Sequence, residues 1–176
     1  GVHFVQIPTT LLAAVDSSVG GKTAIDLQAG KNLAGCFYQP SLVLCDCETL
    51  KSLKPETFSE GMAEVIKYGA IADRKLWEKL RAPIWPQIEE IVARCVEIKR
   101  DIVEQDEFDL GVRQYLNFGH TIGHSIEKNS GYEISHGRGA GCEAFSEARR
   151  VRGGVPGADA GNVGEIRTAD DDGLFR

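Results

Sequence analysis

At 176 residues, the chain is long enough for one ordinary domain or two small ones. Its apolar fraction of 42% is that of a globular protein able to form a core. The net charge of −6 argues against binding to nucleic acid or to an anionic membrane surface, because both partners favour a basic patch. No apolar run approaches the roughly 18 residues of a membrane span. We therefore expect no nucleic acid and no membrane among its partners.

The five cysteines predict reduced thiols rather than a disulfide framework or a cysteine zinc site. Their number is odd, and no two of them are spaced as C-x-x-C. The first residues also lack the basic start and the long apolar stretch of a signal peptide. These features favour a cytoplasmic protein, and residues 1–7 look like a strand whose domain begins upstream.

Two short apolar runs predict strands within the first 54 residues. One spans residues 2–7, which we interpret as a buried strand ended by Pro8, and the other spans residues 42–45, ended by Asp46. Between them lies a segment rich in Gly, Ser, Asp and Lys, which we expect to be a loop. This pattern indicates part of an α/β domain at residues 1–54.

From Pro55 onward the pattern becomes helical. Apolar residues recur at helical spacing from Phe58 to Gly69 and again from Ile84 to Val103. A third helix is expected from near Arg113 to Lys128, closing at Gly131. The change predicts a helical domain at residues 55–136.

Residues 137–176 differ in composition from the rest of the chain. They hold nine glycines, six arginines and no lysine, whereas residues 1–136 hold nine lysines and five arginines. A reading-frame slip in GC-rich coding DNA produces such an exchange, and a genuine disordered tail is the alternative. We favour the slip and treat residues 137–176 as an aberrant or disordered tail.

The expected third helix carries a polar row. Its members are four, three and four residues apart and share one face: Arg113, Asn117, His120 and His124. Two histidines four apart on a helix are a recognised metal-binding arrangement. A solvated face that happens to include histidines is the alternative, but four polar residues of these types in one row favour a functional role.

The preceding helix carries Glu60, Glu64 and Lys67 opposite its apolar stripe. On pattern alone, an ordinary exposed face with charge pairs is the better interpretation. If this face is turned toward the histidine row, Glu64 and a histidine could share one cation. A carboxylate and imidazoles with an open position suit a catalytic zinc.

Residues 16–23, DSSVGGKT, followed by GKN at 30–32, form a possible anion-binding loop. The segment is not a Walker A motif, because position 16 holds no glycine. A Gly-Gly-Lys-Thr turn after a strand can still present backbone N–H groups and an ammonium to an anion. An ordinary glycine-rich turn fits equally well. His136, taken alone, looks like a surface histidine in a loop.

Taken together and in order, six motifs resemble the 3-dehydroquinate synthases. They are IPTTLL at 7–12, DSSVGGKT at 16–23, GKN at 30–32, FYQP at 37–40, GMAEVIKYG at 61–69 and LNFGHTIGH at 116–124. The resemblance covers about residues 1–137. It implies an α/β plus α fold: the second part of a Rossmann-like NAD-binding domain followed by a helical metal-binding domain, with the substrate in the cleft between them.

The resemblance also implies roles for individual residues. The metal ligands, for Zn²⁺ or Co²⁺, would be Glu64, His120 and His136, and His124 would be a catalytic, phosphate-contacting residue rather than a second ligand from the same helix. The other substrate-site residues would be Asp16, Lys22, Lys67, Lys99, Arg113 and Asn117, with Lys99 and Arg113 holding a carboxylate. The NAD contacts would be Thr9, Thr10, Lys22, Lys31, Thr49, Leu50, Lys51 and Ser52.

The implied reaction is a lyase step of the shikimate pathway, which leads to the aromatic amino acids. A sugar phosphate, 3-deoxy-D-arabino-heptulosonate 7-phosphate, would be cyclised to 3-dehydroquinate with release of phosphate, in an enzyme that is a homodimer at full length. The resemblance further implies that this chain is a fragment that lacks the family's upstream glycine-rich segment and departs from the family after Gly137. We therefore expect the fragment to be inactive by itself.

Three alternatives stay open. Another NAD- and metal-dependent sugar phosphate cyclase would share most motifs, although Arg113 favours a substrate with a carboxylate. A polyol dehydrogenase of related architecture would not release phosphate. A non-catalytic remnant would bind metal weakly and would show no NAD-dependent phosphate release.

Overall fold

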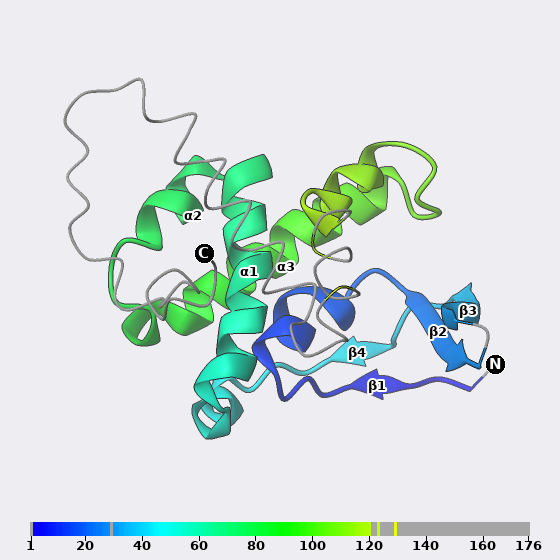
Figure 1. The fold of residues 1–176 in the computed structure, drawn as a ribbon, viewed down its shortest axis with the longest axis horizontal. Coiled ribbons are helices and arrows are strands. Elements are labelled where there is room, and N and C mark those ends of the chain that lie inside the picture. The colour runs from blue at the N-terminus through cyan, green and yellow to red at the C-terminus, as the bar shows by residue number, and fades with distance from the viewer. Residues whose placement is uncertain (1, 29, 121–122, 124–128, 130–176) are drawn as a thin grey trace.

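The computed structural model describes residues 2–28, 30–120, 123 and 129. A short parallel sheet and a hairpin lie on one side of a group of helices (Figure 1). The elements are β1 (Val5–Gln6), a π-helical turn η1 (Ala13–Ser17), β2 (Lys22–Leu27), β3 (Gly30–Phe37), β4 (Leu42–Val43), η2 (Cys47–Ser52), α1 (Pro55–Ile71), α2 (Arg74–Lys79), η3 (Trp85–Gln87), α3 (Ile88–Gln105) and η4 (Val112–Asn117). None of the helices described has the length and apolar character needed to cross a membrane.

The two predicted strands form a parallel pair, with Val5 opposite Leu42. The prediction of a buried strand over residues 2–7 is wrong in extent and in burial. β1 covers only Val5–Gln6, and the side chains of Val2, Val5 and Ile7 are exposed. A sheet of two strands leaves much of its side-chain surface open to solvent, and β1 pairs only with β4 in the described part of the chain.

The segment expected to be a loop contains a β-hairpin instead. β2 and β3 pair in antiparallel register, with Lys22 opposite Phe37 and Thr23 opposite Cys36. The strands approach so closely that a Cβ on Gly35 would overlap the carbonyl oxygen of Thr23. The signal missed in the sequence is the alternation of Thr23, Ile25 and Leu27, which the glycines and lysines around it obscure.

The first two helical predictions are confirmed. α1 begins at Pro55, where the missing N–H costs no helical hydrogen bond, and α3 begins at Ile88 because Pro86 lies in the 3₁₀ turn before it. Their apolar stripes meet in one core with the turn after β1. Its fully buried members include Leu11, Val15, Met62, Val65, Ile91 and Cys95.

α2 was not predicted from the sequence. Its first turn is capped by Asp73, whose Oδ1 accepts hydrogen bonds from the backbone N–H groups of Lys75 (2.8 Å) and Leu76 (3.1 Å). Leu76 then packs into the core beside α1. The helix is short, so its apolar positions give little periodicity to recognise.

The predicted third helix is interrupted. Residues 112–117 form the 3₁₀ turn η4, which ends where Phe118 becomes extended (ψ 126°) and Gly119 adopts φ +80°. That left-handed conformation is one that glycine adopts easily, and it stops the helical run. Arg113 and His120 therefore do not lie in one row on one helix, so this part of the prediction is wrong. Beyond His120, only Gly123 and Asn129 belong to the described residues, and the tail at 137–176 lies wholly outside them.

The close approach of α1 to the turn before η1 gives a testable prediction. A Cβ on Gly61 would lie 2.6 Å from both Leu11 Cβ and Leu12 N. We expect Gly61→Ala to lower the free energy of unfolding by about 1–3 kcal/mol, even against a gain of about 1 kcal/mol in helix propensity. In urea denaturation, Glu56→Ala is the control, because Glu56 is an exposed position of the same helix. Equal losses in the two variants would refute the tight contact.

Candidate functional site

The middle of α1 is buried on every side, from Gly61 to Gly69. This includes Glu64 (1% exposed) and Lys67 (3% exposed), which lie one turn apart and form an ion pair. The interpretation of this polar face as an ordinary solvated surface is therefore wrong. Four elements pack against α1: η1, α2, α3 and η4.

Glu64 and His120 are brought together, as the shared-cation hypothesis requires. His120 Nε2 lies 4.0 Å from Glu64 Oε1. The other oxygen, Oε2, is buried and ion-paired with Lys67 but accepts no hydrogen bond. A buried carboxylate is costly unless it is paired, so Glu64 favours contact with positive charge.

A complete set of metal ligands does not lie within the described residues. Among residues 2–28, 30–120, 123 and 129, no three His, Cys, Asp or Glu side chains gather closely enough to hold an ion. The third predicted ligand, His136, lies outside the described residues, as does the predicted catalytic His124. The structure thus describes two of the three predicted ligands.

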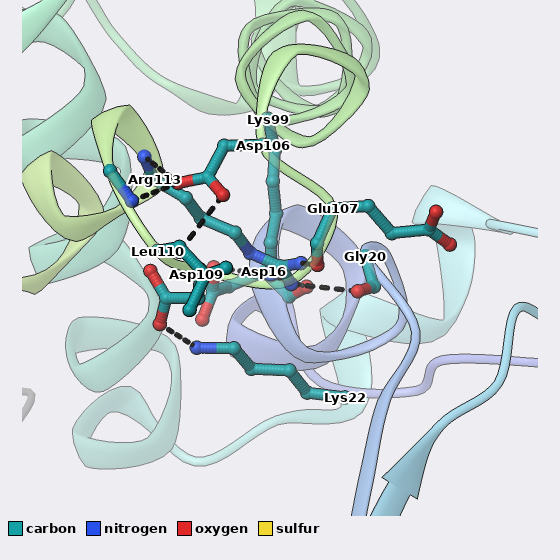
Figure 2. A network of polar contacts seen from close by, with 10 residues as sticks. Asp16, Gly20, Lys22, Lys99, Asp106, Glu107, Asp109, Leu110 and Arg113 are labelled. Atoms are coloured by element: carbon teal, nitrogen blue, oxygen red, sulfur yellow. Dashed lines mark hydrogen bonds and ion pairs between the residues drawn. The ribbon is translucent and has the colours of Figure 1, made fainter.

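Asp16 is placed by the wide turn of η1, in which Ser18 N donates to Ala13 O over 3.1 Å. Single π-helical turns often occur at functional sites. Here the turn directs Asp16 toward α1 and α3. The Oδ1 atom accepts a hydrogen bond from Tyr68 Oη and another from Lys99 Nζ, both 2.8 Å long. Lys99 also donates to the main-chain oxygen of Asp16 at 2.5 Å, and Figure 2 shows Lys99 descending from α3 to this point.

The ionisation states follow from these contacts. Burial alone would raise the pKa of Asp16, but the charges of Lys99 and Lys67 and the hydrogen bonds from Lys99 and Tyr68 outweigh burial and hold that pKa well below its ordinary value. Burial lowers the pKa of Lys99 against the opposing effect of Asp16. Burial, together with the charge of Asp16, raises the pKa of Tyr68 far above its ordinary value. At neutral pH, Asp16 is an anion and Tyr68 is a hydrogen-bond donor.

The lowered pKa of Asp16 makes stability depend on pH. Its folded pKa lies below the value of about 3.9 for an unfolded aspartate, so its contribution is complete above about pH 4 and is lost as the pH falls toward the folded pKa. We expect the free energy of unfolding to fall more steeply between pH 5 and pH 3 in the chain than in its Asp16→Asn variant. Urea denaturation across this range measures the slopes. The exposed Asp101→Asn variant is the control, and an unchanged slope in Asp16→Asn would contradict the assignment.

A loop after α3 joins the hairpin to the helices (Figure 2). Arg113, 2% exposed, donates from Nη2 to Gly20 O at 2.7 Å and from Nη1 to Glu107 O at 2.5 Å. Gly20 has φ +100°, and a Cβ there would lie 2.6 Å from Arg113 Nη2, so only glycine fits. On the same loop, Asp109 forms an ion pair with Lys22 of β2. Arg113 is therefore held against Gly20, and Lys22, two residues further on, is held by Asp109.

The predicted NAD contacts fall into two groups. Thr9 and Thr10 follow β1, and Thr49, Lys51 and Ser52 lie in η2, which follows β4. Because β1 and β4 are parallel, these segments both leave the sheet at its carboxyl edge, where α/β proteins bind dinucleotides. Leu50 is 1% exposed and packs in the core, so only its backbone is available to a ligand. Lys31 lies on β3 and is not part of this edge.

Several polar residues at the site escaped the sequence analysis. Tyr68 lies four residues after Glu64 in the GMAEVIKYG motif, but the motif alone assigns it no role. Asp106 accepts hydrogen bonds from the backbone N–H groups of Leu110, Gly111 and Arg113, and so shapes the loop that carries Asp109. An aspartate directly after a helix is a local signal for such a turn, because its side chain can accept from backbone N–H groups a few residues later.

Asn117, a predicted substrate residue, is exposed at the end of η4.

The fold resembles solved structures of two synthases with NAD⁺ and a metal ion bound. A structure of 2-deoxy-scyllo-inosose synthase, complexed with carbaglucose-6-phosphate, NAD⁺ and Co²⁺, matches with a TM-score of 0.74 at 30% identity, over 86% of this chain and 44% of that one. ValA, a 2-epi-5-epi-valiolone synthase from Streptomyces hygroscopicus subsp. jinggangensis 5008 with NAD⁺ and Zn²⁺ bound, matches with a TM-score of 0.71 at 26% identity, over 82% and 42%. The fold is that of the sugar phosphate cyclases.

Sequence comparison narrows this class to one family. The model of the 3-dehydroquinate synthase N-terminal part matches residues 1–60, and the model of its C-terminal part matches residues 61–156. This chain belongs to the 3-dehydroquinate synthase family, as its motifs predicted. It is 54% identical to the 3-dehydroquinate synthase of Enterococcus faecalis (strain ATCC 700802 / V583) over 145 residues, and 54% identical to that of Clostridium perfringens (strain 13 / Type A) over 143. These alignments cover 79% and 78% of this chain but only 40% and 41% of the relatives.

Proposed function

We propose that this chain supplies the metal-binding and substrate-binding part of a 3-dehydroquinate synthase. The complete enzyme would cyclise 3-deoxy-D-arabino-heptulosonate 7-phosphate to 3-dehydroquinate and release phosphate. The observation that carries the proposal is the buried Glu64–Lys67 ion pair, with the half-buried His120 next to it, beside the Asp16–Lys99 ion pair. Because the chain spans about two fifths of the length of its curated relatives, the whole reaction is assigned to the complete enzyme.

The described residues fit a divalent metal. Two ligands of one tetrahedral zinc, each about 2.0–2.1 Å from it, lie roughly 3.4 Å apart, close to the 4.0 Å between Glu64 Oε1 and His120 Nε2. Oε2 of Glu64 is engaged by Lys67, so Oε1 is the oxygen that faces His120. Glu64 and His120 would hold the ion with His136 as the third ligand.

The cationic residues suit a substrate with a phosphate and a carboxylate. Lys99 and Arg113 are buried, and Lys22 stands at the turn that Arg113 holds. Each is oriented by a partner from the chain: Lys22 by Asp109, Lys99 by Asp16, and Arg113 by two carbonyl groups. Groups held in this way lose little freedom when they bind an anion, which supports tight positioning of the substrate.

The carboxyl edge of the β1–β4 sheet is the proposed NAD site, through Thr9, Thr10 and η2. When bound, NAD would carry the hydride, and the metal would polarise the hydroxyl that is oxidised. The chain's own part is to hold Asp16 ionised and to keep the lysines close to the reacting centre. A cytoplasmic location and a homodimeric complete enzyme stay predictions.

Another sugar phosphate cyclase activity is the second candidate, because the solved structures named above belong to such enzymes. The higher identity to 3-dehydroquinate synthases, 54% against 26–30%, favours the first. The buried Arg113 also favours a 3-dehydroquinate synthase, because a carboxylate on the substrate would neutralise the charge of this guanidinium.

A chimeric enzyme tests the proposal. In the Enterococcus faecalis relative, the 145 matching residues would be replaced by those of this chain. We expect NAD-dependent release of phosphate from 3-deoxy-D-arabino-heptulosonate 7-phosphate, with 3-dehydroquinate as the organic product. The chain alone is expected to release none. An inactive chimera that folds and binds zinc would refute the assignment and leave the remnant hypothesis.

A further inference from the structure

Tyr68 is the largest fully buried side chain among the described residues, yet its hydroxyl is committed to a polar contact. It donates to Asp16 Oδ1 at 2.8 Å, and the same oxygen accepts from Lys99 Nζ at 2.8 Å. A carboxylate oxygen offers about two acceptor positions, so these two donors occupy Oδ1. Together they fix the rotation of the carboxylate and leave acceptor capacity on Oδ2 for a ligand.

The ring of Tyr68 has a second contact with the site. The ammonium of Lys67 lies 5.0 Å from the centroid of this ring, within the range of a cation–π interaction. One turn of α1 thus carries the proposed metal ligand Glu64, the cation Lys67 and the donor that holds Asp16. The charged and titratable groups that face Asp16 include Lys99 and Cys95 from α3, and Lys67 and Tyr68 from α1.

We propose that Tyr68 is a positioning residue, whose hydroxyl orients the Asp16 carboxylate toward the substrate of the proposed reaction. This inference rests on the proposed function. Tyr68 acts through Asp16 rather than by touching the substrate itself. The raised pKa of its phenol keeps the hydroxyl a donor throughout the physiological pH range.

Tyr68→Phe tests the hydroxyl alone, because it keeps the ring and its contact with Lys67. In the chain as it stands, carbon-13 NMR would follow the carboxyl signal of Asp16, identified by its loss in Asp16→Asn. We expect Tyr68→Phe to shift this signal at neutral pH, and to start its movement toward the protonated position about one pH unit higher. Tyr115→Phe is the matched control, because Tyr115 is 67% exposed, and it should change neither observation.

In the active chimera, Tyr68→Phe is expected to raise KM for the sugar phosphate about three- to tenfold and to change kcat less than about twofold. A merely structural role would instead reduce the fraction of active enzyme, which lowers apparent kcat and leaves KM unchanged. An unchanged KM, or an unmoved Asp16 signal, would overturn the positioning role. If the chimera with Tyr68 intact shows no cyclase activity, the proposed function fails, while the NMR experiment still decides the contact with Asp16.

A second substitution covers the case in which Tyr68→Phe does not fold. Site-specific 3-fluorotyrosine at position 68 keeps the hydroxyl and makes it a stronger donor. The Asp16 signal should then begin to titrate at a lower pH, opposite in direction to Tyr68→Phe. No displacement, or a displacement to higher pH, would overturn the proposal.

Discussion

Glu64→Gln is expected to weaken zinc binding by the chimera at least about a hundredfold, because loss of a direct ligand should cost no less than loss of an outer partner. The substitution keeps the shape of the side chain but removes the charge that faces both His120 and Lys67. Phosphate release should fall by a similar or larger factor, since the proposed chemistry depends on the ion. Competition with a chromophoric chelator measures the affinity, and a phosphate assay measures the rate.

Glu56→Gln provides the matched control for this experiment. Glu56 lies in the first turn of the same helix and is exposed. We expect wild-type zinc affinity and activity from it. Glu64→Gln with wild-type zinc affinity in a folded protein would mean that the carboxylate is not a ligand, whatever the activity.

Lys99→Met is expected to destabilise the chain by about 2–4 kcal/mol. Lys99 is 6% exposed, and its ammonium holds both the side chain and the main chain of Asp16. Methionine fills a similar volume, so the loss would come from a largely buried carboxylate left with Tyr68 as its donor. Urea denaturation at pH 7 measures the change.

A double-mutant cycle separates the ion pair from packing. Asp16→Asn combined with Lys99→Met should cost about 1–3 kcal/mol less than the sum of the single variants, because each single variant leaves the other charge unpaired. Arg100→Met, on an exposed position of α3, should change stability by less than about 0.5 kcal/mol. Additive losses for Asp16 and Lys99 would contradict a coupled pair.

The two long helices were predictable because their apolar residues recur at helical spacing over several turns. The proline at the start of α1 even identifies its first residue. The hairpin at residues 22–37 was missed because its alternation is short and diluted by glycine, and its side chains are largely exposed, so burial leaves little pattern. The break at Gly119 was also missed, because nothing in the local sequence distinguishes a helical glycine from one with a positive φ.

The hypothesis that Glu64 and a histidine share a cation came from the residue types, because carboxylates and imidazoles bind zinc. Their proximity in space was not predictable from the sequence. Periodicity placed Glu64 on the polar face of its helix, and such faces are usually solvated. Only tertiary packing shows that Glu64 and Lys67 on this face are buried. Tyr68 could not be assigned from the sequence for a related reason: a buried tyrosine inside a helix is compatible with simple packing, and its donor role depends on a turn 52 residues away in the chain.

X-ray absorption at the zinc edge tests the central claim most directly, on the zinc-loaded chimera and its Glu64→Gln and His120→Ala variants. With Glu64 and His120 as ligands, the spectrum should show only oxygen and nitrogen neighbours at about 2.0–2.2 Å, and each variant should lose one of them. Sulfur neighbours at about 2.3 Å, or a spectrum that neither variant changes, would place the ion elsewhere and contradict the shared-cation site.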